Sequence, residues 1–201
     1  MTEHLTHRHG RRRGRPRSVE ADEAIIKAAL ELVADEGIGA LTVEAVASRA
    51  GVGKTTIYRR WNCKAELVDA AFTRLSEQLP EARGTTTRER LVSLIGDPHG
   101  GPSTLPSRLL PRILSHKMAQ PEMYAEFFAR VIEPRRERFR VELRRGIARG
   151  DLRDDLDLDA MVNALVAPYL YYVLLMPAAQ HQPDDLPERV VDLALEGLAA
   201  R

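Results

Sequence analysis

The chain has 201 residues, enough for one large helical domain or for a small domain on a larger one, and its formal net charge is +1. Residues 1–64 hold 12 Lys and Arg against 8 Asp and Glu, a net charge of +4, whereas residues 65–201 hold 18 against 21, a net charge of −3. The only cysteine is Cys63, which excludes an intramolecular disulfide and a zinc site built on several cysteines. These values favour a cytoplasmic protein whose basic first part binds a polyanion.

Residues 1–17 are rich in Arg, His and Gly and have almost nothing to bury, so we expect a flexible basic arm and no secretory signal. Residues 13–17 read Arg-Gly-Arg-Pro-Arg, the core of the AT-hook pattern. The glycine allows a close approach to DNA, the proline keeps the chain extended, and A·T-rich minor grooves attract arginine. The alternative is a tail that only improves solubility. The candidate DNA contacts are Arg13, Arg15 and Arg17.

The next segment predicts four helices, over residues 18–36, 42–50, 53–61 and 64–79. Ser18 and Thr42 are suitable N-caps, and Gly37 and Gly51 are suitable ends for the first two helices. Two short helices joined by a tight glycine turn have the dimensions of a helix-turn-helix. The second helix of that motif lies in the major groove of DNA.

At about 100° per residue, Ile57 and Trp61 face inward on the second short helix, and Thr55 and Arg59 face outward. The outer face is polar and basic, so it offers phosphate contacts and hydrogen bonds to base edges. The alternative is an ordinary solvated surface. The candidate contacts on this helix are Lys54, Thr55, Thr56, Tyr58 and Arg59.

Residues 41–64 include Gly-Val-Gly-Lys-Thr-Thr-Ile-Tyr and end in Trp-Asn-Cys-Lys. This stretch strongly resembles the DNA-binding domain of the TetR family of bacterial regulators, and the similarity extends over residues 19–71. The resemblance implies an all-helical homodimer that represses transcription from a palindromic operator until a small molecule binds. It also implies phosphate contacts from Thr42, Tyr58 and Lys64, with Lys54, Thr55 and Arg59 facing the groove.

The segment Gly-Val-Gly-Lys-Thr at residues 51–55 also looks like the end of a phosphate-binding loop. That pattern requires a glycine five positions before the Gly of Gly-Lys-Thr, and this chain has Ser48 there. It also requires a preceding strand, where a helix is expected. We therefore reject a nucleotide-binding loop.

The remainder predicts helices over residues 86–95, 105–119, 121–149, 157–176 and 184–199, with a kink or break at Pro134. Residues 161–179 are apolar but contain Asn163 and two prolines, so we interpret them as a buried helix and not as a membrane span. The last two helices have wide apolar faces, which favours a dimer interface; the alternative is intramolecular core. The expected division is an arm over 1–17, a helix-turn-helix domain over 18–64, and an effector-binding and dimerisation domain over 65–201.

Several aromatic and sulfur-containing side chains of the second domain are suited to an apolar effector, although core packing is the alternative for each. The arginines between residues 130 and 149 are interleaved with Glu133, Glu137 and Glu142, so we expect ion pairs there. No catalytic group, metal site or cofactor is predicted. The alternatives to a regulator are an architectural DNA-binding protein and, more remotely, an enzyme or partner-binding protein. The candidate effector-binding residues are His116, Met123, Tyr124, Phe127, Tyr169 and Tyr172.

Overall fold

The computed structural model describes residues 19–95, 105–176 and 183–198, and these fold into helices and turns without a β-strand. The all-helical class is therefore confirmed. The elements are α1 (Val19–Glu36), η1 (Ile38–Ala40), α2 (Val43–Ala50), α3 (Lys54–Tyr58), α4 (Lys64–Glu77), α5 (Thr87–Ile95), α6 (Leu105–Ser115), α7 (Pro121–Phe127), η2 (Phe128–Ile132), α8 (Glu133–Ala148), α9 (Leu158–Leu174) and α10 (Leu186–Leu198).

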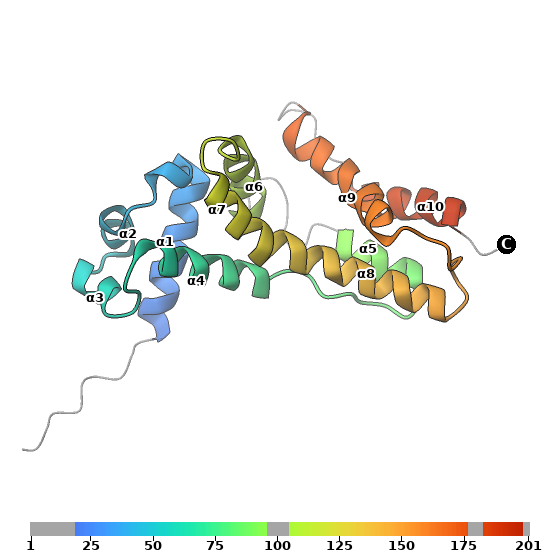
Figure 1. The fold of residues 1–201 in the computed structure, drawn as a ribbon, viewed down its shortest axis with the longest axis horizontal. Coiled ribbons are helices and arrows are strands. Elements are labelled where there is room, and N and C mark those ends of the chain that lie inside the picture. Colours follow the sequence, from blue (N-terminus) through green and yellow to red (C-terminus); the bar gives the residue numbers. More distant parts are fainter. Residues whose placement is uncertain (1–18, 96–104, 177–182, 199–201) are drawn as a thin grey trace, which may run out of the picture.

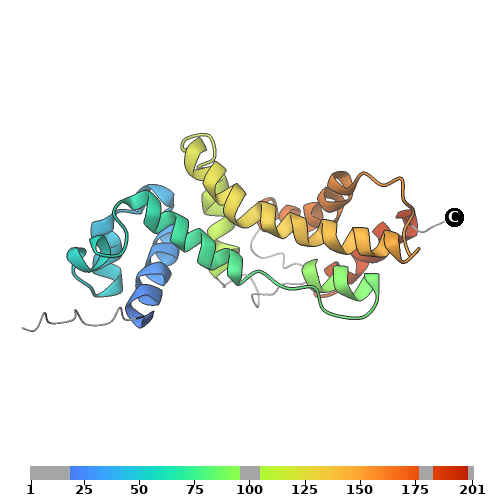
Figure 2. The same cartoon turned by 60° about the horizontal axis from the view of Figure 1, so that its bottom comes forward.

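The molecule is elongated (Figure 1). Helices α1 to α4 form one end, and α5, α9 and α10 lie towards the other. Figure 2 shows α7 and α8 as one long rod that connects the two ends. Within the described parts of the chain, no helix is both long and apolar enough to cross a membrane.

Two hydrophobic cores follow from this arrangement. The first joins α1 to α4 with α6, α7 and η2, and it contains Ile57, Phe72 and Phe127. The second joins α5, α8, α9 and α10 around Phe139 and Leu143. Phe72 of α4 meets Phe127 edge to face, with the ring centroids 5.3 Å apart. The first core therefore extends across the expected domain boundary at residue 64.

Caps explain the starts of α2 and α9 and the end of α1. The Thr42 side chain accepts a hydrogen bond from the backbone N–H of Ala45 at 3.1 Å, and Asp157 caps α9 in the same way through Asp159 and Ala160. Gly37, with φ 89°, ends α1 in a conformation that favours glycine. These caps confirm the sequence-based starts of α2 and α9.

The rod contains a π-helical turn, η2, which comes directly before α8. Pro134 lies in the first turn of α8, and because it has no N–H it cannot make the bond to the residue 130 carbonyl that would continue an α-helix from η2. The expected irregularity near Pro134 thus takes the form of a wide turn on its N-terminal side. The helix expected over 105–119 ends earlier, at Ser115.

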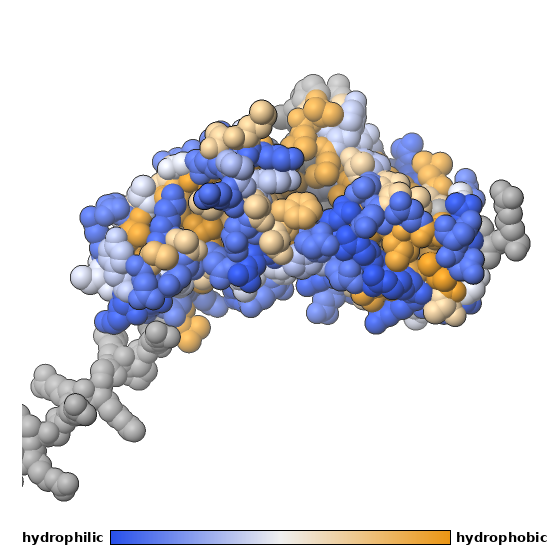
Figure 3. Space-filling view, viewed as in Figure 1, coloured by the Kyte–Doolittle hydropathy of each residue, from blue (hydrophilic) through white to orange (hydrophobic). Residues whose placement is uncertain are grey.

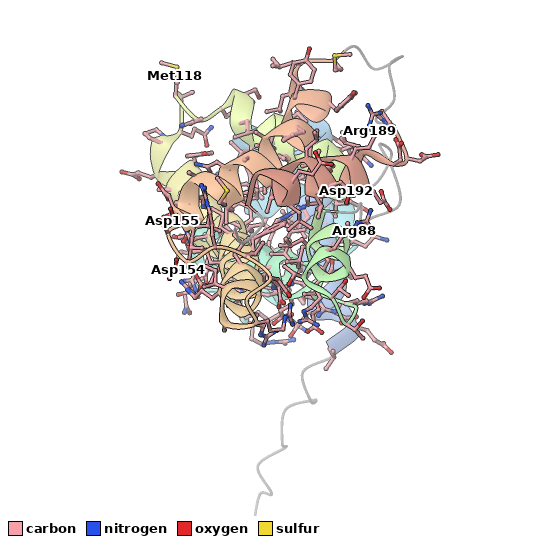
Figure 4. All side chains as sticks on the ribbon, turned by 90° about the vertical axis from the view of Figure 1, so that its right-hand side faces the viewer. Arg88, Met118, Asp154, Asp155, Arg189 and Asp192 are labelled. Atoms are coloured by element: carbon pink, nitrogen blue, oxygen red, sulfur yellow. The ribbon has the colours of Figure 1, made fainter. Side chains whose placement is uncertain are left out.

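The second core is bound at its edge by an ion pair between α5 and α10. Arg88 donates two hydrogen bonds to the carboxylate of Asp192, at 2.6 and 2.9 Å, and Figure 4 shows the two side chains close together. Glu142 of α8 is buried and accepts hydrogen bonds from Arg90 and Arg145. These bonds hold the pKa of Glu142 below its ordinary value. The last helix is therefore fixed to the body by charge as well as by apolar contact.

Candidate nucleic-acid interface

The turn between α2 and α3 depends on Gly51. Its φ of 67° lies in the left-handed region, and its N–H bonds back to carbonyl oxygens of α2. The N–H of Val52 closes the turn by donating to the Ala47 carbonyl oxygen at 3.0 Å. This turn lets α3 follow α2 after only three residues, Gly51 to Gly53.

Helix α3 buries one side and exposes the other, as the sequence predicts. Ile57 is 1% exposed in the first core, whereas Tyr58 is 50% exposed. Thr56 is partly buried. The remaining candidates on this surface are exposed: Lys54, Thr55 and Arg59. The structure therefore brings the predicted contacts of this helix together on one accessible face.

Regular helix in α3 covers only residues 54–58, shorter than the expected 53–61. The N–H of Arg60 donates to the Ile57 carbonyl oxygen at 2.8 Å, which tightens the chain into a turn. The Arg60 side chain also bonds the Thr56 carbonyl oxygen at 3.0 Å. Arg59 consequently projects from the end of α3 and not from its middle.

Arg60 has a structural role in this region that the sequence reasoning missed. Its side chain is 4% exposed and donates a hydrogen bond to the carboxylate of Asp22 in the first turn of α1. This ion pair fixes the end of α3 against α1, so Arg60 is a positioning residue for the exposed face. The two residues are 38 positions apart, and no local pattern pairs them.

Lys54 is held by an acidic neighbour on α2. Its Nζ lies 2.8 Å from Oε1 of Glu44, and this hydrogen bond lowers the pKa of Glu44. Both side chains are more than half exposed, so the pair is weak and exchangeable. The Lys54 ammonium has three donors, so it can also bind a second acceptor beside the Glu44 carboxylate.

The segment after α3 places Lys64 at the start of α4. The Glu66 carboxylate accepts a hydrogen bond from the backbone N–H of Asn62 at 2.8 Å, which closes the turn and lowers the pKa of Glu66. Thr42 is exposed at the start of α2, and Lys64 is partly buried. Arg13, Arg15 and Arg17 lie outside the described residues.

The arginines of α8 offer no comparable surface. Arg140 bonds Asp159, Glu133 and Glu137, and these bonds raise the pKa of Arg140 above its ordinary value. Arg144 bonds Glu137 at 2.8 Å. The expected ion pairs are thus confirmed.

The candidate effector residues fall into two groups. Phe127 is buried in the first core, and Tyr124 and Met123 pack against it from α7. His116 follows α6, with Nδ1 2.9 Å from the Arg112 carbonyl oxygen, and a Cβ placed on Gly37 would lie 3.0 Å from its ring. Tyr169 and Tyr172 lie on α9 in the other half, where Tyr172 meets Tyr171 edge to face. The described residues contain no group of three side chains placed to hold a metal ion.

Two family models match the chain. Residues 25–71 match the model described as "Bacterial regulatory proteins, tetR family", and residues 85–194 match the model described as "Tetracyclin repressor-like, C-terminal domain". The second match alone covers more than half of the chain. Together they span both ends of the molecule in Figure 1.

Curated relatives match over about a third of the chain. The chain is 40% identical over 70 residues to YdeS of Bacillus subtilis, an uncharacterized HTH-type transcriptional regulator; the match covers 34% of this chain and 35% of that protein. It is 42% identical over 60 residues, 30% of each chain, to the DNA-binding transcriptional repressor TetR of Mycobacteroides abscessus. The matches thus span about a third of these curated relatives.

Solved structures show the same fold over nearly the whole chain. The fatty acid degradation regulator FadR from Bacillus halodurans superposes with a TM-score of 0.68, covering 90% of this chain and 97% of that one, at 19% sequence identity. At this identity the likeness concerns the fold alone.

Proposed function

The chain belongs to the tetR family of bacterial regulatory proteins, and from this premise we propose a repressor that binds a palindromic operator as a homodimer and releases it when a small molecule binds. Membership makes the protein a DNA-binding regulator of transcription. We place its action in the cytoplasm, on chromosomal DNA, and assign it no catalysis. The relative from Mycobacteroides abscessus is named a repressor, which supports that direction of control.

The proposed DNA binding rests mainly on the exposure of α3, which has one side buried in the core and the other side in solvent. Ile57 anchors the helix in the core while Tyr58, Thr55 and Arg59 stand in solvent beside it. Side chains of these types bind phosphate oxygens and base edges, and a helix of this width enters the major groove. We assign Tyr58, Thr42 and Lys64 to phosphates and Arg59, Thr55 and Lys54 to the groove.

The dimer is supported by apolar side chains that α9 and α10 leave in solvent. Leu175 and Leu193 are each 71% exposed, and Tyr171 and Leu174 are also accessible. Figure 3 shows apolar atoms at the far end of α9, at the top of the view. Exposed leucines in such numbers favour a partner surface. A two-fold dimer through these helices would present two α3 helices to a palindromic operator.

The arm supplies a second DNA contact in this proposal. We assign Arg13, Arg15 and Arg17 to the minor groove beside the operator. A chain without residues 1–17 should bind the operator more weakly and with a smaller dependence on salt. Equal affinity and equal salt slope for the two chains would remove the arm from the interface.

The test of the whole proposal is selection of bound DNA from a random pool at fixed salt, followed by footprinting on the selected sequence. We expect one short palindrome, bound by a dimer. Diffuse protection of A·T-rich DNA would instead indicate an architectural protein, and no protection would indicate a partner-binding protein or an enzyme. Leu193→Glu, which places a charge on the exposed face of α10, should shift the protein towards monomer in sedimentation.

A further inference from the structure

A groove lies between the first turns of α4 and the N-terminal end of α7. Its volume is about 990 Å³, within the size range of sites for small organic ligands. One wall belongs to the DNA-binding end of the molecule, through Trp61, Ala65 and Val68, and the opposite wall comes from residues 119–123 and the α7 side chains beyond. The groove therefore lies between the DNA-binding helices and the rod, within the part of the molecule built on the first core.

The lining combines apolar surface with negative charge. Trp61, Val68 and Met123 provide the apolar part, and small side chains such as Ala65 and Ala119 leave the groove open. Four carboxylates line it and only one cation, Arg130. The carboxylates are those of Glu66, Asp69, Glu122 and Glu126.

Arg130 compensates only part of this charge. It lies 2.7 Å from Oδ1 of Asp69 and 2.9 Å from Oε1 of Glu126, and its hydrogen bond lowers the pKa of Glu126. Glu66 also has a lowered pKa, so these groups are ionised at neutral pH. Glu122 forms no ion pair with another described residue.

The lining thus has a net charge of −3 from its side chains. The N-terminal ends of α4 and α7 oppose it, but a helix end contributes only about half a positive charge. The net charge of the groove therefore remains negative. This negative charge would repel an anionic ligand, and a neutral ligand would make no charge interaction with it.

We infer that this groove binds a small amphipathic organic cation, with its apolar part against Trp61 and its charge beside Glu122. The inference rests on the proposed function, because it names the chemical class of the effector. Aromatic faces and carboxylates together bind organic cations by cation–π attraction and by charge.

Occupation of this groove would act on DNA binding through α4. Trp61 follows α3 by three residues and packs on the first core, and Lys64, the proposed phosphate contact, begins α4. A ligand inserted between α4 and α7 changes how α4 lies on the body. The proposed phosphate contact and the end of α3 would then move together.

The binding test uses two probes of similar shape and opposite charge, tetraphenylphosphonium and tetraphenylborate. Trp61 is the only tryptophan, so its emission in the full-length protein reports the groove directly. We expect saturable quenching by the phosphonium and no saturable response to the borate. Equal responses to both probes, or no response to either, would overturn the inference.

Three variants locate the site. Glu122→Gln should weaken phosphonium binding about fivefold by removing one charge from contact. Ala119→Leu should weaken it further by narrowing the groove, and both positions are exposed, so folding is retained. Asp154→Asn, a charge loss at an exposed site beyond α8 (Figure 4), should leave binding unchanged. Equal losses in Glu122→Gln and Asp154→Asn would place the probe elsewhere and overturn the inference.

A separate measurement distinguishes the groove from the proposed function. The selected operator is titrated with protein in the presence of saturating phosphonium, and we expect at least a tenfold loss of affinity. If quenching changes with the variants as expected but the operator is not released, the cation site stands. Effector control through that site is then refuted. Operator binding without any phosphonium response would refute the cation site and leave the regulator intact.

Discussion

Two basic regions of this molecule look alike in sequence and differ in structure. Helix α8 carries more arginines than α3, yet Arg136, Arg140 and Arg144 each bind carboxylates. Beside α3, Arg59 forms no ion pair with another described residue and is exposed. The difference teaches that the number of cations is a poor guide to a nucleic-acid surface. What matters is positive charge that the protein itself leaves uncompensated.

The largest expected effect comes from Arg60, whose side chain is 4% exposed. Arg60→Ala leaves Asp22 without its partner and should cost about 3 kcal/mol of folding free energy. Thermal unfolding of the DNA-free protein measures this loss. Asp22→Asn should lower stability in the same direction, whereas unchanged unfolding in both variants would show that the pair does not hold α3.

Arg59→Ala is the most direct test of the difference between the arginine beside α3 and the arginines of α8. It should weaken operator binding by about tenfold to a hundredfold and change the preferred base at one operator position. The matched control is Arg144→Ala, which removes an arginine of similar sequence context that is bound to Glu137. That variant should leave DNA binding unchanged. Equal losses in the two variants would contradict the distinction between free and compensated arginines.

Lys64→Ala and Tyr58→Phe should reduce affinity by a smaller factor, about threefold to tenfold, on every DNA sequence. A phosphate contact carries no base information, so the selected consensus should remain the same. For Lys64→Ala the slope of log affinity against log salt should also fall by about one. A changed consensus would move these residues into the groove.

The smallest expected effect is an increase in operator affinity. Glu44→Gln removes the carboxylate that holds Lys54 and removes a negative charge from the DNA-facing side. Operator affinity should therefore rise, by about twofold to threefold, as expected for an exposed pair. Gel-shift titrations at two salt concentrations measure the gain. A lower affinity would show that Glu44 positions Lys54 for DNA.

The sequence alone predicted the features that depend on neighbouring residues. The Thr42 cap, the turn at Gly51 and the inward side of Ile57 follow from periodicity and capping chemistry. The contacts of Arg60 with Asp22 and of Lys54 with Glu44 join separate helices, so no local pattern contains them. The groove between α4 and α7 was not foreseen for the same reason, since residues 61–70 form one wall and residues 119–130 form the other.

The π-helical turn before α8 has a consequence for the evolution of the chain. Such a turn holds one residue more than an α-helical turn, and each residue of an α-helix rotates its successors by about 100°. Phe127 of α7 lies in the first core and Phe139 of α8 lies in the second, and the extra residue stands between them along the rod. Deletion of a single residue in η2 would make the rod a more regular helix. It would also rotate one of the two phenylalanines out of its core and into solvent. Insertions and deletions should therefore be rarer in this rod than in the turns beside it.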